Sequence, residues 1–121
     1  MLAELSSALR PQPRYQQWLT VGHREDILLV SVDEVDYFQS LDKYTAVMTR
    51  NKEWTIRTPL KDLEATLNPD RFWRIHRSAI VRVNAIARVT RDLRGRHLLH
   101  LHGHAQPLIV SRLYTHRFQQ M

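Results

Sequence analysis

The chain has 121 residues, of which 43% are hydrophobic, and it carries a formal net charge of +6 and no cysteine. A chain of this length forms one ordinary domain with enough apolar side chains to bury a core. The lack of cysteine excludes disulfide bonds, thiolate metal sites and a cysteine nucleophile. Because the sequence shows neither a signal-peptide pattern nor about 18 consecutive apolar residues, we expect a soluble, cytoplasmic protein.

Residues 1–16 are predicted to be a linker, and residues 17–121 to form the folded domain. Residues 1–9 are compatible with a short helix, which Pro11 and Pro13 would end. Since a linker normally joins two parts of a protein, we expect the chain to be one module of a longer protein.

Short segments rich in β-branched and aromatic residues follow the linker, with turn residues between them. They predict strands over residues 18–22, 27–31, 35–40, 45–49 and 53–57. Their short connections favour antiparallel pairing, because parallel strands need long crossovers.

A short central helix is predicted over about residues 59–67, where leucines recur on one face before Asn68 and Pro69. Thr58 is expected to be its N-cap, with Pro59 as its first residue. Further strands are predicted over residues 85–90, 96–101 and 106–110, followed by a C-terminal helix over about residues 111–119 that Ser111 caps. The fold class is therefore mainly β.

The charge is concentrated in the second half of the chain. Residues 1–70 carry a net charge of −3 and residues 71–121 a net charge of +9, and 15 of the 18 basic residues are arginine. The arginine side chain is a planar fork suited to phosphate or guanine. We therefore expect a polyanionic partner, although a basic composition also arises from solubility or from codon usage in a GC-rich genome.

Residues 71–83 combine this charge with core-forming side chains, because Arg71, Arg74, Arg77 and Arg82 alternate with apolar residues. The apolar residues are assigned to the core: Phe72, Trp73, Ile75, Ile80 and Val81. His76 is expected to organise the segment as a hydrogen-bond donor, and Ser78 to cap a turn.

Four segments of the chain, taken together, resemble the LytTR family of DNA-binding domains. They are residues 27–44, 58–63, 71–81 and 107–112, in matching order and spacing. The resemblance covers roughly residues 18–120. It implies an elongated, mainly antiparallel β fold that reads DNA through loops, with no enzymatic activity and no cofactor. It also implies the output domain of a two-component response regulator, with promoter DNA as partner, a preceding receiver domain, and a homodimer on repeated half-sites.

The resemblance also suggests the residues that contact DNA. Arg77 and Arg112 are predicted to read bases, and Lys43 and Tyr44 to contact the backbone. Further backbone or minor roles fall to His76, Ser78, Arg82 and Ser111. Alternatively, the two arginines cap carbonyl groups or pair with an acid such as Asp70, and Tyr44 is a half-buried strand residue.

Arg82 departs from the family pattern, which commonly has asparagine there, whereas this chain reaches Asn84 two residues later. Arg82 either adds a phosphate contact or is a solvated substitute. A second basic cluster surrounds the turn at residues 92–95 and is either a solvated hairpin tip or a DNA backbone contact: Arg88, Arg91, Arg94 and Arg96.

Other functions stay open from the sequence alone. His76 and Arg77 have the chemistry of an RNase-like enzyme, but no paired base, acid or glycine-rich phosphate loop accompanies them. A nonspecific nucleic-acid-binding module and a protein-interaction module are further alternatives. His100, His102 and His104 would share one face of a strand and there chelate a metal, although an exposed polar face is the preferred interpretation.

Overall fold

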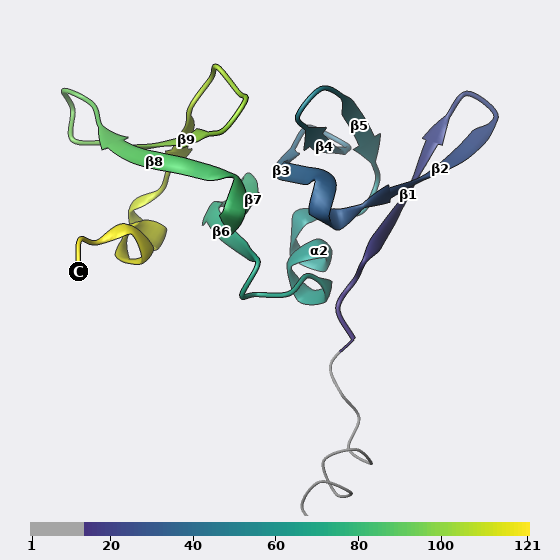
Figure 1. The fold of residues 1–121 in the computed structure, drawn as a ribbon, viewed down its shortest axis with the longest axis horizontal. Coiled ribbons are helices and arrows are strands. Elements are labelled where there is room, and N and C mark those ends of the chain that lie inside the picture. The colour runs from purple at the N-terminus through teal and green to yellow at the C-terminus, as the bar shows by residue number, and fades with distance from the viewer. Residues whose placement is uncertain (1–13) are drawn as a thin grey trace, which may run out of the picture.

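Residues 14–121 are described in a computed structural model (Figure 1), so most of the linker predicted at residues 1–16 lies outside the described residues. The strands are β1 (Trp18–His23), β2 (Asp26–Ser31), β3 (Val35–Ser40), β4 (Thr45–Thr49), β5 (Glu53–Ile56), β6 (Phe72–His76), β7 (Ala79–Arg82), β8 (Ile86–Arg91), β9 (His97–Leu101) and β10 (Leu108–Val110). The helices are the α-helix α2 (Leu60–Thr66) and the 3-10 helices η1 (Val32–Glu34), η2 (Val83–Ala85) and η3 (Arg112–Phe118). None of the helices described in residues 14–121 has the length and apolarity of a membrane span.

The strands form three antiparallel sheets. A central five-stranded sheet has the order β5-β4-β3-β7-β6, and the β1-β2 ribbon and the three-stranded sheet β10-β9-β8 complete the fold. Figure 1 shows the ribbon and the three-stranded sheet at opposite ends of the long axis, with the central sheet between them. The predicted fold class, an elongated and mainly antiparallel β fold with a central and a C-terminal helix, is confirmed.

The central sheet contributes to two hydrophobic cores because successive side chains of a strand point to opposite faces. Phe38 of β3 and Ile80 of β7 belong to the core shared with α2 and the β1-β2 ribbon. Tyr37 and Val81, their neighbours in sequence, belong to the core shared with the three-stranded sheet and η3. The residues assigned to the core in the arginine-rich segment are buried as predicted, with Trp73 half-buried.

The central helix is one residue shorter at each end than predicted, and the predicted N-cap is wrong. Pro59 is the capping residue of α2, and no side chain caps the helix. Thr58 instead has its carbonyl oxygen engaged, because the hydroxyl of Thr45 donates to it across 2.7 Å. The connection between β5 and α2 is thereby fixed to the start of β4.

The C-terminal helix is present but is the 3-10 helix η3, and the predicted cap by the Ser111 side chain is absent. Ser111 is held through its backbone, since its N–H donates to the carbonyl oxygen of Ile75 across 2.9 Å. Phe118 at the end of η3 packs against Trp73 of β6 with ring centroids 5.9 Å apart. These contacts dock η3 beside β6.

Candidate nucleic-acid interface

Three segments with predicted DNA contacts lie at one end of the central sheet. β3 ends there at Ser40 and β4 begins at Thr45, and their loop contains Lys43 and Tyr44. The tight turn between β6 and β7, with Arg77 at its centre, lies at the same end because Ala79 pairs with Gln39 of β3. We call residues 41–44, 76–78 and 111–112 the loop edge.

Backbone hydrogen bonds hold the loop edge together. The N–H of Ser40 donates to the carbonyl oxygen of Ser78 across 2.9 Å, which joins the β3–β4 loop to the β6–β7 turn. The N–H of Leu41 donates to Tyr44 across 2.7 Å and closes the loop. The bond from Ser111 to Ile75 places Arg112 next to the end of β6. Segments up to about 70 residues apart in sequence thus form one surface.

The side chains predicted to contact DNA are available on this surface. Lys43, Arg77 and Arg112 are exposed, and Tyr44 has 46% of its surface exposed at the position just before β4. Over residues 14–121, none of the ion pairs involves Lys43, Arg77 or Arg112. The alternative in which Asp70 pairs with Arg77 or Arg112 is therefore not observed. The DNA-binding roles stay predictions, and the geometry leaves these side chains free to fulfil them.

The β6–β7 turn is held by Arg74, which the sequence did not single out. Its Nε donates to the carbonyl oxygen of His76 across 2.8 Å, and its terminal nitrogen donates to that of Arg77 across 2.6 Å. The guanidinium is mostly buried and lies 3.6 Å from Glu64 of α2. Because one rigid fork spans both carbonyl groups, Arg74 fixes the backbone from which the Arg77 side chain projects.

His76 and Ser78 complete the turn, though not as predicted for His76. The backbone N–H of Ser78 donates to Nδ1 of His76 across 3.1 Å, so this ring nitrogen is an acceptor and not a donor. The Ser78 hydroxyl lies 2.8 Å from the same nitrogen. Both side chains therefore shape the turn. In the described part of the chain, no carboxylate bonds to His76 as the orienting acid of a nucleophilic serine would.

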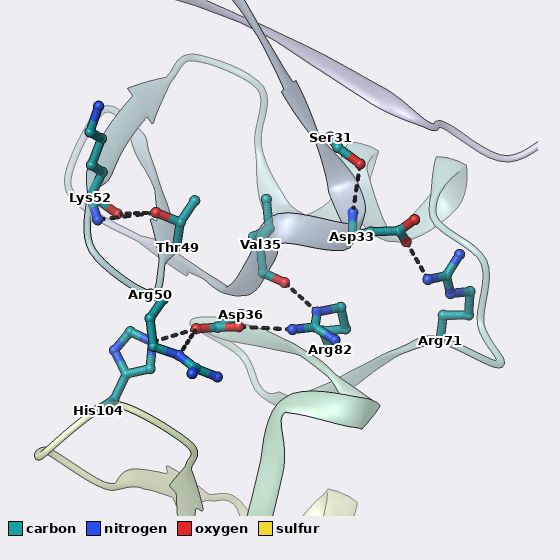
Figure 2. Close-up of polar contacts among 10 residues, drawn as sticks. All are labelled: Ser31, Asp33, Val35, Asp36, Thr49, Arg50, Lys52, Arg71, Arg82 and His104. Atoms are coloured by element: carbon teal, nitrogen blue, oxygen red, sulfur yellow. Dashed lines mark hydrogen bonds and ion pairs between the residues drawn. The ribbon is translucent and has the colours of Figure 1, made fainter.

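Arg82 has a structural partner that the sequence did not reveal. Its side chain is 18% exposed, and it donates to the carboxylate of Asp36 across 3.0 Å and to the carbonyl oxygen of Val35 across 3.0 Å. Figure 2 shows Asp36 between Arg82, His104 and Arg50. The interpretation of Arg82 as a solvated substitute is wrong, and its DNA contact stays a prediction.

The Asp36 cluster, consisting of Asp36, Arg82, His104 and Arg50, connects the central sheet to the β9–β10 loop. Asp36 is 2% exposed, and Nε2 of His104 lies 2.7 Å from its carboxylate while Nε of Arg50 lies 3.9 Å away. Buried charges are retained only when they are paired in this way. Burial raises the pKa of the adjacent Tyr37, and the negative charges of Glu53 and Asp36 raise it further.

The second basic cluster contains an internal ion pair. The carboxylate of Asp92 accepts a 2.6 Å bond from Nε of Arg96, and this bond together with backbone donors lowers the pKa of Asp92.

The histidines do not form the arrangement expected from the sequence. β9 ends at Leu101, so His102 and His104 lie beyond the strand and do not share one face with His100 as expected. No group of three or more potential ligands is found in residues 14–121.

Comparisons with known proteins identify relatives of the chain. The family model described as the LytTr DNA-binding domain matches residues 25–121. An uncharacterized response regulatory protein of Vibrio cholerae is 38% identical over 89% of the chain and 42% of that protein. The positive alginate biosynthesis regulatory protein of Pseudomonas aeruginosa is 37% identical over 76% of the chain and 37% of that protein. The chain thus spans less than half the length of these curated relatives.

A solved structure shares the fold. It is described as the "LytTr DNA-binding domain of putative methyl-accepting/DNA response regulator from Bacillus cereus", and it superposes with a TM-score of 0.76 at 29% identity. The match covers 85% of this chain and 94% of that one. The chain therefore belongs to the LytTR family of DNA-binding domains.

Proposed function

We propose that the chain is the sequence-specific, double-stranded DNA-binding output domain of a transcriptional response regulator. The observation that carries the proposal is the loop edge, where backbone hydrogen bonds gather Lys43, Tyr44, Arg77 and Arg112. These side chains are exposed and form no ion pairs among the described residues, which supports a role in binding an anion that extends along the loop edge. The family membership supports DNA as that anion.

Arg77 is the proposed reader of sequence. A guanidinium can donate two hydrogen bonds to N7 and O6 of guanine, and such a pair discriminates against a wrong base by about 1–3 kcal/mol. The Arg74 fork holds the backbone of this turn, so little ordering is required when Arg77 binds. Arg112 is the second proposed base contact.

Lys43 and Tyr44 are proposed to contact the DNA backbone. Lysine is a flexible point charge and suits phosphates better than base edges. The start of β4 and the β6–β7 turn are two to three strand spacings apart in the central sheet, which is roughly 10–14 Å. The major groove is about 12 Å wide, so a side chain in the groove and one on the flanking backbone can be engaged together. His76, Ser78 and Ser111 would position these contacts.

The context in the whole protein is part of the proposal. The Vibrio cholerae relative is named a response regulatory protein, which supports a preceding receiver domain as a partner. We infer that the protein acts in the cytoplasm without catalysis and dimerises on repeated promoter half-sites. A nonspecific binding module is the alternative.

Selection of binding sites from a pool of random duplexes tests the proposal. A recovered motif, bound more tightly than random duplex at the same salt concentration, is expected. Equal binding of all duplexes would favour the nonspecific module, and cleavage of single- or double-stranded RNA in a parallel assay would favour the RNase-like enzyme. Both outcomes contradict the proposal.

A further inference from the structure

Arg57 lies at the same end of the central sheet as the loop edge, one strand farther out. β4 and β5 pair antiparallel with Thr45 opposite Ile56, so the next position along each strand brings Tyr44 and Arg57 together. The Arg57 side chain is exposed. It enters none of the ion pairs that the described residues form.

The surface around Arg57 is hollowed and carries positive charge. Lys43, Tyr44 and Arg57 line one hollow of about 330 Å³ together with Asp42, Pro59 and Leu60. Asp42, Lys43 and Arg57 are its charged residues and give it a net charge of +1. A phosphodiester carries one negative charge, so the hollow and the DNA backbone are complementary in charge.

The backbone on both sides of Arg57 is fixed. Ile56 is paired to β4, and the carbonyl oxygen of Thr58 accepts the 2.7 Å bond from the hydroxyl of Thr45. Pro59 follows with its restricted φ angle of −64°. Because the chain is held at both neighbours, binding of an anion by Arg57 requires only its side chain to be ordered.

We propose that Arg57 is a phosphate-binding residue that extends the DNA contact surface of the loop edge across β5. The contact lies on the side of Lys43 and Tyr44 that faces away from Arg77. We assign it to the sugar-phosphate backbone, because Arg57 lies beside the proposed backbone contacts Lys43 and Tyr44, and β4 and β3 separate it from the turn that carries Arg77. This inference rests on the proposed function in taking DNA as the ligand.

The test compares Arg57→Gln with Arg24→Gln, which removes the same charge from an exposed arginine. Arg24 is at the tip of the β1-β2 ribbon. Its neighbour His23 has its ring 5.6 Å from that of Trp54, near the start of β5, whereas Arg57 follows the end of that strand. The affinity of the whole chain is measured as a function of salt on the selected duplex and on a random duplex of the same length. Circular dichroism melts show whether each variant is folded.

Arg57→Gln is expected to lower the affinity for both duplexes by the same factor of about 5. It should also reduce the magnitude of the slope of log K against log[salt] by about 0.9, the value for one phosphate. Arg24→Gln should leave the slope unchanged, and Arg57→Lys should restore it. Equal slopes for the wild type and Arg57→Gln, or equal losses in the two glutamine variants, would overturn the inference. If the wild type shows no sequence preference, the proposed function fails, whereas a reduced slope on random duplex still supports the Arg57 contact.

Discussion

The backbone N–H of Ser40 donates to the carbonyl oxygen of Ser78 across 2.9 Å. This bond continues the pairing of β3 with β7 beyond the terminal pair of Gln39 and Ala79, and it joins the loop carrying Lys43 to the turn carrying Arg77. Lys43, the proposed contact to the DNA backbone, and Arg77, the proposed base contact, therefore project from the same hydrogen-bonded end of the central sheet. Movement of one relative to the other would require the strand pairing to open.

Lys43→Ala is expected to weaken binding to specific and random duplexes alike. Lys43 is exposed in the β3–β4 loop, and a lysine that neutralises one phosphate contributes about 0.9 to the salt slope. Fluorescence anisotropy titrations between 50 and roughly 200 mM salt give this slope. A change confined to the specific duplex would show that Lys43 reads a base.

Arg74→Lys is expected to impair recognition although the charge is kept. An ammonium cannot reproduce the planar fork that donates to the carbonyl oxygens of His76 and Arg77. The ammonium can still donate to one of the two carbonyl oxygens, so one charged hydrogen bond is lost, and we expect a stability loss of about 1.5–3 kcal/mol. Urea denaturation measures this loss, and the specificity ratio should fall as well. Wild-type specificity in a folded Arg74→Lys variant would mean that sequence recognition does not depend on the hydrogen bonds of Arg74 to the turn.

Arg82→Ala is expected to destabilise the domain by about 3 kcal/mol, the lower end of the cost of breaking a buried ion pair. We expect the lower end of that range because His104 and Arg50 still face the Asp36 carboxylate after Arg82 is removed. The control is a double-mutant cycle of Asp36→Leu, Arg82→Met and the variant that carries both substitutions, which removes both charges and should lose less stability than the two single variants combined. Additive losses in urea denaturation would mean that the pair is not coupled.

Gly103→Ala is expected to disturb the same Asp36 cluster from the β9–β10 loop. Gly103 has a φ angle of +78°, which costs an alanine about 1 kcal/mol, and a Cβ there would overlap the side chain of Arg50. We expect a melting temperature lower than that of Gly95→Ala, which shares the positive φ angle but has open space around it. Equal melting temperatures would show that Arg50 moves away without loss.

Asp92→Asn is expected to remove a pH-dependent part of the stability. The folded-state pKa of Asp92 is lowered, chiefly by its hydrogen bond from Arg96, so its contribution is present above the unfolded-state pKa near 4. The contribution is lost as the pH falls through the folded-state pKa. The difference in stability between wild type and Asp92→Asn, from urea denaturation at several pH values, should therefore shrink below about pH 4. A constant difference would contradict this linkage.

The sequence predicted the strands, the central helix and the positions of the loop edge because alternation, turn residues and family motifs are local patterns. It missed the role of Arg82 because its partner Asp36 is 46 residues away, and a single sequence contains no signal for that pairing. The cap predicted at Thr58 was wrong because the helix begins one residue later than expected, with Pro59 at the capping position. In the sequence, Arg74 is one of several arginines in residues 71–83, and only the structure shows its two hydrogen bonds to the carbonyl oxygens of the β6–β7 turn.

The most direct test of the account is the ratio of affinities for selected and random duplex, measured at one salt concentration for the wild type and Arg77→Ala. A lost bidentate contact of about 1–3 kcal/mol predicts that Arg77→Ala lowers this ratio by about 5- to 150-fold. The affinity for random duplex should change far less. An unchanged ratio in the folded variant, or a ratio of one for the wild type, would contradict sequence reading through the loop edge.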